Sequence, residues 1–310
     1  MERISPQKSF FSSSFQSYPK EKILQSIKEK GYFSYPNALT NEFISQVEFD
    51  ATSEKLNINK NKISGVYTNT QYYFPNLLAV SKVFFDFISS NFIKNLCSQY
   101  FDNKFRLKAL RYYETYGRHN MQWHSDNKTD KNFAEIPGLI FIFYISDVED
   151  GEFQYIEGSH RWSGEKFLND YSDDFIEKNY KKNIKSFKLP KGSLIIYNTY
   201  GIHRAKPVNH KNFVRKSVFF QIDGTDSDSE PIFLNASYLD NNEEWIRGLF
   251  GFGKPSNYSP FPQTSLKTIP FPLALKSAFT IFLYSLRSSV IFFLPLRIRK
   301  IIERIIKSRT

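Results

Sequence analysis

A change of hydrophobic period near residue 105 is the feature that most constrains the fold. Before it, apolar residues recur at helical spacing, which predicts helices over 20–30, from about residue 40, and over 83–100. After it, short apolar runs that alternate or continue without a break are typical of strands. The strands expected are 105–116, 139–146, 151–156, 193–197 and 214–222. Helices followed by short strands predict a mainly β fold with flanking α-helices, arranged as a helix-backed sandwich or jelly roll.

One turn in this strand region carries a strong signal of its own. Asp150-Gly151 separates the apolar run 139–146 from the run that ends at Ile156. An Asp-Gly pair favours a tight hairpin, because such a turn needs positive φ. We therefore expect these two strands to pair with each other.

The charge is placed unevenly along the 310 residues. Lys and Arg number 42 against 31 Asp and Glu, a formal net charge of +11. The segment 276–310 holds eight of the cations and a single acid, Glu303, so it carries +7 of that charge. The rest of the chain is only mildly basic. A basic tail suggests an anionic partner, such as a membrane surface.

Cysteine usage and the first residues bear on location. Cys97 is the only cysteine, so no intrachain disulfide can form, and a reducing compartment is expected. The N-terminal residues lack the apolar core of a secretory signal. Both observations predict a cytoplasmic protein. The predicted organisation is a flexible arm over 1–18, one main domain over 19–235, and a C-terminal extension over 236–310.

The C-terminal extension contains two apolar stretches. The first, 277–296, is interrupted by Arg287 and Pro295 and is not expected to span a membrane. In the second, Ile298, Ile301, Ile302, Ile305 and Ile306 recur at helical spacing among basic residues. This predicts a basic amphipathic helix. Packing of the isoleucines on the body of the protein or on another subunit is the commoner fate of such a stripe. The other interpretation is a peripheral contact with the inner face of an anionic membrane. No nucleic-acid-binding motif is present, and none is expected.

Three residues form a candidate metal site. His124 and Asp126 are two positions apart, so on an extended backbone both side chains project to the same side. His203 follows the strand 193–197 and could be delivered to them by a neighbouring strand end. Two imidazoles and one carboxylate on one face of a metal are the ligand set of non-haem Fe(II) oxygenases. Taken alone, a His-x-Asp tripeptide is usually accidental, so the interpretation depends on its surroundings.

An arginine at the right distance supports the metal interpretation. A keto-acid co-substrate such as 2-oxoglutarate needs a planar cationic fork for its far carboxylate. Arg215 lies twelve residues after His203 on the next predicted strand, and Ser217 shares its face. Arg204 is the second choice, since it neighbours the ligand and should point away. A surface cation on an edge strand is the competing interpretation of Arg215.

Other polar residues near these motifs are assigned lesser roles. His160 is expected to be structural, and His119 and His210 to be loop residues. Lys108 and Arg111 fall on opposite faces of the strand 105–116, so at most one is expected to face the site.

Several motifs in order resemble the phytanoyl-CoA dioxygenase family. Trp123-His124-Ser125-Asp126 matches its proximal motif, and Gly158-Ser159-His160 is similar to its Gly-Ser-His stretch. Gly192 to Arg215 resembles its distal segment, in which a glycine and an apolar strand precede His, Asn and Arg. The likeness runs from about Lys20 to about Asp223, roughly two-thirds of the chain.

The resemblance implies a double-stranded β-helix, a cupin-like jelly roll, with Fe(II) on His124, Asp126 and His203. It further implies that Arg215 and Ser217 bind 2-oxoglutarate, and that O2 is used to hydroxylate an unactivated C–H bond, releasing succinate and CO2. Related halogenases have Gly or Ala where Asp126 stands, so hydroxylation is preferred. The expected substrate is a small or lipid-linked molecule. The alternatives are a non-enzymatic jelly-roll scaffold and a metal cupin that does not use 2-oxoglutarate.

Overall fold

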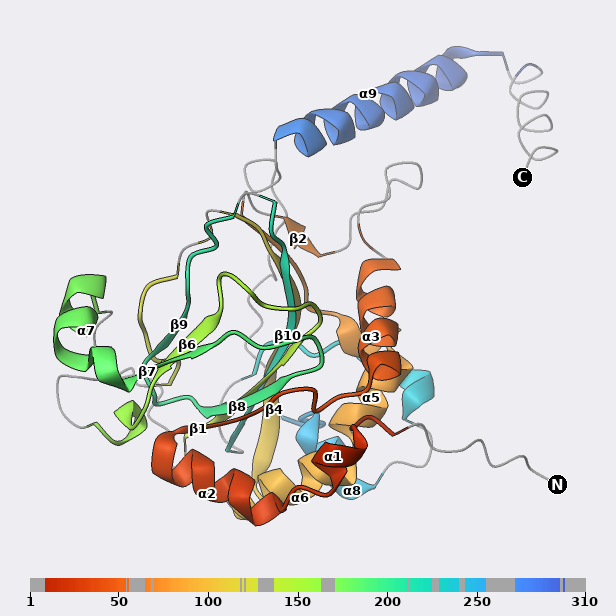
Figure 1. The fold of residues 1–310 in the computed structure, drawn as a ribbon. Coiled ribbons are helices and arrows are strands. Elements are labelled where there is room, and N and C mark those ends of the chain that lie inside the picture. Colours follow the sequence, from red (N-terminus) through yellow and green to blue (C-terminus); the bar gives the residue numbers. More distant parts are fainter. Residues whose placement is uncertain are drawn as a thin grey trace.

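The computed structural model describes most of the chain. The described residues are 9–53, 55, 65–67, 70–117, 119, 121–127, 137–162, 171–210, 212–224, 229–239, 243–254, 271–295 and 298. Within them, two antiparallel sheets face each other, and helices lie against the larger one (Figure 1). The predicted fold class, a mainly β jelly roll with flanking helices, is confirmed.

The larger sheet contains seven strands in the order β1-β8-β5-β10-β4-β3-β2. Their bounds are β1 Tyr32–Tyr35, β8 Leu194–Asn198, β5 Leu139–Tyr144, β10 Arg215–Gly224, β4 Phe105–Thr115, β3 Gln71–Phe74 and β2 Val66–Tyr67. The central strand β10 pairs with β4 on one side and with β5 on the other. β2, β3 and β4 follow one another in this order, but from β5 onward the chain alternates between the sheets, since β6, β7 and β9 belong to the smaller one, as a jelly roll requires.

The smaller sheet has the order β7-β6-β9, with β7 at Ile184–Phe187, β6 at Phe153–Ile156 and β9 at His203–Ala205. Aromatic and aliphatic side chains from both sheets meet in the space between them, among them Tyr144 and Tyr197 from the larger sheet and Phe153 and Phe187 from the smaller. This inner layer closes one end of the jelly roll.

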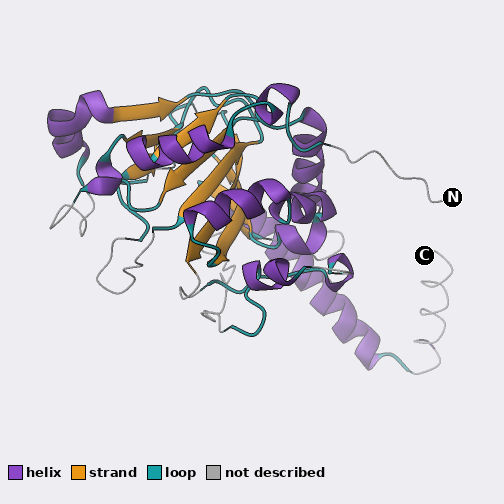
Figure 2. Cartoon of the chain, turned by 90° about the horizontal axis from the view of Figure 1, so that it is seen from below, coloured by secondary structure: helices purple, strands orange, loops and turns teal. Residues whose placement is uncertain are grey.

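Helices cover the other face of the larger sheet (Figure 2). They are α2 Lys20–Lys30, α3 Asn41–Ser53, α4 Leu77–Val80, α5 Lys82–Ile88, α6 Asn91–Tyr100 and α8 Glu244–Leu249. Their buried faces form the main core with the sheet, where Phe84 and Phe87 meet Phe143 and Phe220. A further helix, α7 Asp173–Tyr180, packs Ile176 against Trp123 beside the smaller sheet.

The helix expected over 83–100 is two helices. Ser89 ends α5, and Ser90 begins α6 with an extended backbone (φ −78°, ψ 157°). The break lies at two consecutive serines, but neither of their buried hydroxyls forms a hydrogen bond with a described residue, so it is the backbone turn at Ser90 and not serine capping that separates the helices. The apolar stripe itself was correctly identified, since Phe84, Ile88, Phe92 and Leu96 are all buried.

The hairpin expected at Asp150-Gly151 is wrong. Gly151 does have positive φ (64°), but β5 belongs to the larger sheet and β6 to the smaller. The turn therefore carries the chain from one sheet to the other. The Asp150 carboxylate accepts backbone hydrogen bonds from Asn209 and His210, which ties this crossover to the loop before β10.

Residues near both ends of the predicted main domain pack on its core. Residues 9–18 include the short helix α1 (Ser13–Gln16), and Phe15 is buried in the core, so this part of the expected arm is held by aromatic packing. At the other end, α8 buries Ile246 and Leu249, so the body continues past residue 235.

The last described helix, α9 Phe271–Phe293, projects away from the two sheets (Figure 1). Among the described residues, no helix is both long and apolar enough to cross a membrane. Apart from Ile298, the amphipathic helix expected over 298–306 lies outside the described residues.

Candidate active site

Three potential metal ligands converge between the two sheets. The backbones of His124 and His203 form a β-bridge, with each N–H donating to the other's carbonyl at 3.0 and 2.9 Å. Asp126 Oδ2 lies 3.2 Å from His203 Nε2, and Asp126 Oδ1 lies 3.8 Å from His124 Nε2. One ligand atom from each of the three residues lies within 4.8 Å of the others. The predicted triad is therefore brought together at a spacing that one metal ion can bridge.

The two imidazoles are oriented by backbone carbonyls. His124 Nδ1 is 2.8 Å from the Gln122 carbonyl, and His203 Nδ1 is 3.0 Å from the Gly201 carbonyl. A carbonyl only accepts, so each Nδ1 must carry the proton. Each Nε2 then keeps a free lone pair in the neutral ring, and both Nε2 atoms face Asp126. This is the arrangement by which proteins prepare histidines for a metal.

Tyr197, near the end of β8, contacts two of the three candidate ligands. Its hydroxyl lies 3.4 Å from Asp126 Oδ2 and 3.3 Å from His203 Nε2. Burial and the nearby Asp126 raise the pKa of Tyr197 well above its ordinary value, so the hydroxyl stays protonated and can donate to the carboxylate. Burial alone would raise the pKa of Asp126. The interactions with His203 and His124 outweigh this effect, so the net shift of the pKa is downward. Asp126 is thus kept in the anionic form that binds cations.

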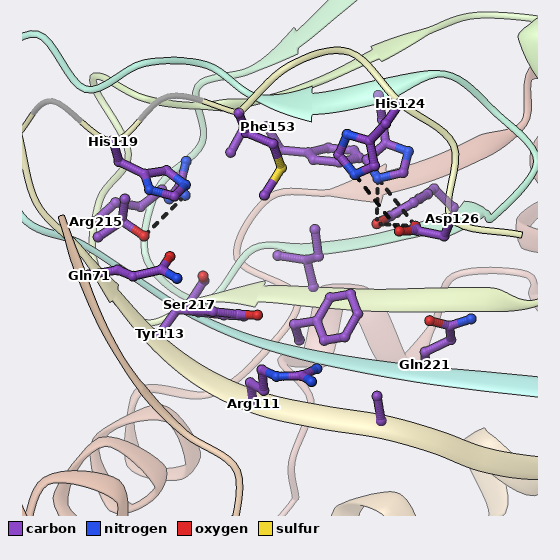
Figure 3. Close-up of a pocket in the computed structure, with 18 of the residues that line it drawn as sticks. Gln71, Arg111, Tyr113, His119, His124, Asp126, Phe153, Arg215, Ser217 and Gln221 are labelled. Carbon is purple, nitrogen blue, oxygen red and sulfur yellow. Dashed lines mark hydrogen bonds and ion pairs between the residues drawn. The ribbon is translucent and has the colours of Figure 1, made fainter. Parts of the chain in front are cut away.

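A cavity of about 440 Å³ extends from the triad along the inner face of the larger sheet. Figure 3 shows Arg215 and His119 at one end and His124 and Asp126 at the other. Ser217 and Tyr113 lie between the two ends, paired across β10 and β4. Phe153, Ile142 and Phe219 supply apolar wall. The volume is in the range typical of sites for small molecules.

Of the three arginines Arg111, Arg204 and Arg215, only Arg215 forms no salt bridge among the described residues, although Glu152 and Asp150 act on its charge at longer range. Its side chain donates to the Gly151 carbonyl and, at 3.2 Å, to the Thr115 hydroxyl, and among the described residues no carboxylate forms a salt bridge with it. Only 8% of its surface is exposed, and burial lowers its pKa from the ordinary value. By contrast, Arg111 pairs with Glu230 and Arg204 with Asp173. A buried cation without an anion is costly unless a ligand supplies one.

The second-choice arginine faces away from the cavity. Arg204 stacks over the ring of Trp123 at 4.4 Å and donates to Gln154 as well as to Asp173. It therefore secures α7 to the smaller sheet. The expectation that its position next to His203 would turn it away from the site is confirmed.

The expectation that only one of Lys108 and Arg111 faces the site is wrong. Both line the cavity, because the pairing of β4 with β10 shifts register between Gln221 and Ile222. This β-bulge inserts one residue and changes which side chains point inward. Strict alternation along β4 is thereby broken at the position where Lys108 lies.

Lys108 belongs to a buried polar network behind the triad. Asp223, fully buried at the end of β10, accepts from Lys108 Nζ at 3.0 Å, Asn127 Nδ2 at 3.1 Å and Gln221 Nε2 at 2.9 Å. Asn127 directly follows the ligand Asp126. The network consequently holds the loop that carries one of the three candidate ligands.

Two cavity residues were not singled out from the sequence. Tyr197 lies near the end of the strand that precedes His203. Because it is two residues after the inward-facing Ile195, strand alternation could have predicted that it also points inward. His119, expected to be an ordinary loop residue, lines the cavity beside Arg215, and burial lowers its pKa, as does the charge of Arg215. Both effects favour the neutral form of this imidazole. His160, as expected, lies elsewhere, with Nε2 at 3.0 Å from the Lys28 carbonyl.

Comparison with solved structures identifies proteins of similar fold. HygX from Streptomyces hygroscopicus, solved with nickel and 2-oxoglutarate, has a TM-score of 0.53 at 15% identity and matches 75% of this chain and 96% of its own. HygX with nickel, 2-oxoglutarate and hygromycin B has a TM-score of 0.52 at 14% identity, covering 74% and 94%. SnoK, a non-haem α-ketoglutarate-dependent carbocyclase from nogalamycin biosynthesis, has a TM-score of 0.55 at 12% identity, covering 81% and 98%.

No family model matches the sequence, and no curated protein matches it. The likeness to HygX and SnoK is therefore one of fold. The chain shares its fold with HygX and SnoK. It matches nearly the whole length of both neighbours.

Proposed function

We propose that this protein is an Fe(II)- and 2-oxoglutarate-dependent oxygenase of the phytanoyl-CoA dioxygenase type. One observation carries the proposal: a His-Asp-His cluster shares a cavity with a buried arginine that forms no salt bridge with any described carboxylate. A metal cation fits the first, and the far carboxylate of a dicarboxylic keto acid fits the second. Solved structures of HygX, which has the same fold, contain nickel with 2-oxoglutarate, or iron.

The donor set fits Fe(II). His124 Nε2, His203 Nε2 and one Asp126 oxygen would hold the ion on one face and leave other positions open. When bound, iron supplies the oxidative chemistry that couples decarboxylation of 2-oxoglutarate by O2 to oxidation of a C–H bond. The protein's own residues do the orienting: the carbonyls of Gln122 and Gly201 set both rings, and Tyr197 donates to Asp126.

Arg215 and Ser217 are proposed to bind the co-substrate. The planar guanidinium offers a paired donor face to a carboxylate, and its charge offsets the cost of burying that anion. Ser217 lies two residues along β10 on the same wall of the cavity and adds a hydroxyl donor. Phe153 and Ile142 beside them keep water away, which strengthens these electrostatic contacts.

Hydroxylation of an unactivated C–H bond of a small or lipid-linked substrate is the proposed reaction. Asp126 occupies the position that related halogenases leave to a halide. The cavity volume suits a small molecule or the end of a longer one. HygX has been solved with the small molecule hygromycin B, which supports a substrate of this general size.

Succinate release tests the function. The protein, loaded with Fe(II) under nitrogen and then given 2-oxoglutarate and O2, should form succinate slowly without substrate and faster with a true substrate from a screen. His203→Ala should abolish both rates, because the cluster loses a ligand. Succinate formation that does not depend on added iron, or that persists in His203→Ala, would refute the assignment.

A further inference from the structure

The exposed surface of α9 is not explained by the proposed chemistry. Most of its large apolar side chains are between 41% and 82% exposed, whereas the body of the protein buries nearly all such residues. At about 1.5 Å per residue, its 23 residues form a rod roughly 35 Å long. A solvent-exposed apolar surface of this extent marks an interaction site.

Seven of the apolar residues of α9 form a continuous stripe, whereas the exposed Ile281, Tyr284 and Phe292 lie on other sides of the helix. From Phe271 the seven recur at spacings of three or four residues, which keeps them on one side of a helix. The stripe consists of Phe271, Leu275, Phe279, Phe282, Leu286, Val290 and Phe293. We define these seven residues as the α9 stripe. Near the start of the helix, Ala274 packs against the core of the body and Ser277 is buried.

Charge decides which partner fits the α9 stripe. The helix contains Lys276 and Arg287, both exposed, and no Asp or Glu. In the sequence, six more cations and one acid follow it before residue 310. Two copies of this helix side by side would bring cations together with no acid to pair them, which disfavours self-association. An anionic lipid surface satisfies both features, because it takes up apolar side chains and attracts Lys and Arg.

We propose that α9 lies in the surface of an anionic lipid bilayer, with the α9 stripe among the acyl chains and Lys276 and Arg287 at the headgroups. Arg287 is four residues before Ile291 and one after Leu286, so its long side chain can bury its methylenes beside the stripe and extend its charge outward. The inference is independent of the metal site, since it rests on a helix remote from the cavity.

Flotation of the full-length protein with vesicles tests the proposal. Vesicles of phosphatidylcholine alone are compared with vesicles that also contain phosphatidylglycerol. The wild type should float with the anionic vesicles, should bind neutral ones more weakly, and should be released as salt is raised. Phe282→Glu, in the centre of the stripe, should lower partitioning at least about tenfold, because burying one Phe side chain alone contributes that much.

Ser288→Glu is the matched control. Ser288 is exposed on the same helix but off the stripe, so the variant adds the same charge without removing an apolar contact. It should retain most of the wild-type binding. Because both side chains are exposed, neither substitution should change the melting temperature of the body.

Two results would overturn the proposal. The first is equal binding of Phe282→Glu and wild type to anionic vesicles. The second is a failure of the wild type to float while sedimentation without lipid reveals an oligomer that Phe282→Glu dissociates. That result would assign the stripe to a second copy of the chain.

Discussion

Replacing Arg215 with methionine should have a small effect on the stability of the free protein and a large effect on the binding of 2-oxoglutarate. In the free protein, Arg215→Met removes a buried cation that lacks a carboxylate partner among the described residues, together with its contacts to Gly151 and Thr115. Loss of a cation from a buried ion pair typically costs about 3–5 kcal/mol, because the partner anion is left behind. No salt-bridged anion is left here, because the nearby Glu152 pairs with Lys206 and Asp150 accepts backbone N–H groups. The free energy of unfolding should therefore fall by clearly less than about 3 kcal/mol.

The effect on co-substrate binding should be much larger. A hydrogen bond to a charged group contributes about 1.5–3 kcal/mol. Losing the guanidinium should then weaken 2-oxoglutarate binding by about 10- to 150-fold. Arg215→Lys keeps the charge but not the planar fork, so its affinity should fall between those of Arg215→Met and the wild type.

Thermal unfolding with and without 2-oxoglutarate, in the presence of a bound divalent metal, provides the assay. A ligand at about one hundred times its dissociation constant stabilises a protein by about 2.7 kcal/mol. For a body of this size, that corresponds to a rise in melting temperature of about 5 °C or more. Arg215→Met should lose nearly all of this rise at the same concentration.

Arg204→Met is the control. Arg204 is buried to a similar degree (7% exposed) and lies eleven positions away, but it pairs with Asp173 outside the cavity. Arg204→Met should lower the stability of the protein, but 2-oxoglutarate should still raise its melting temperature as it does in the wild type. The assignment of Arg215 would be refuted if 2-oxoglutarate raised the melting temperature of Arg215→Met as much as that of the wild type. It would also be refuted if only Arg204→Met lost this rise in melting temperature.

Three further substitutions test other parts of the structure. Tyr197→Phe removes the hydroxyl next to Asp126 and His203 and should weaken metal binding by about 10- to 100-fold in a competition titration, and unchanged affinity would contradict the supporting role. Asp223→Ala leaves Lys108 without its anion, so the free energy of unfolding measured by urea titration should fall by about 3 kcal/mol. The double variant Lys108→Met/Asp223→Leu removes both charges and should recover part of that loss. Phe220→Ala opens a cavity where its ring stacks on Phe141 at 4.6 Å and should cost about 3–5 kcal/mol, and a cost below 1 kcal/mol would show that the core there is looser than its packing indicates.

The candidate site was predictable because its residues are encoded locally. His124 and Asp126 share one short extended segment, and Arg215 and Ser217 share one strand, so period-two alternation places each pair correctly. His203 required a long-range step, from residue 124 to residue 203. That step could be made because an apolar strand ends shortly before His203 and another begins shortly after it.

Features that depend on three-dimensional context were not predictable. The break between α5 and α6 and the strand crossover at Asp150-Gly151 follow from which sheet each segment joins. The bulge that turns Lys108 into the cavity arises from the pairing of β4 with β10, and a one-residue shift leaves no mark in a hydrophobic pattern. The sequence likewise could not predict that Arg215 forms no salt bridge with a described carboxylate, since this depends on which acids pair with Arg111 and Arg204.

The most direct test of the account is an anaerobic titration of the Fe(II)-loaded protein with 2-oxoglutarate, followed in the visible spectrum. Chelation of iron by the keto acid produces a weak charge-transfer band. The wild type should develop this band and saturate at one 2-oxoglutarate per iron, and His203→Ala should not develop it. Iron that binds without the band would indicate a cupin that does not use 2-oxoglutarate, and failure to bind iron at all would indicate a scaffold; either result would contradict the proposed function.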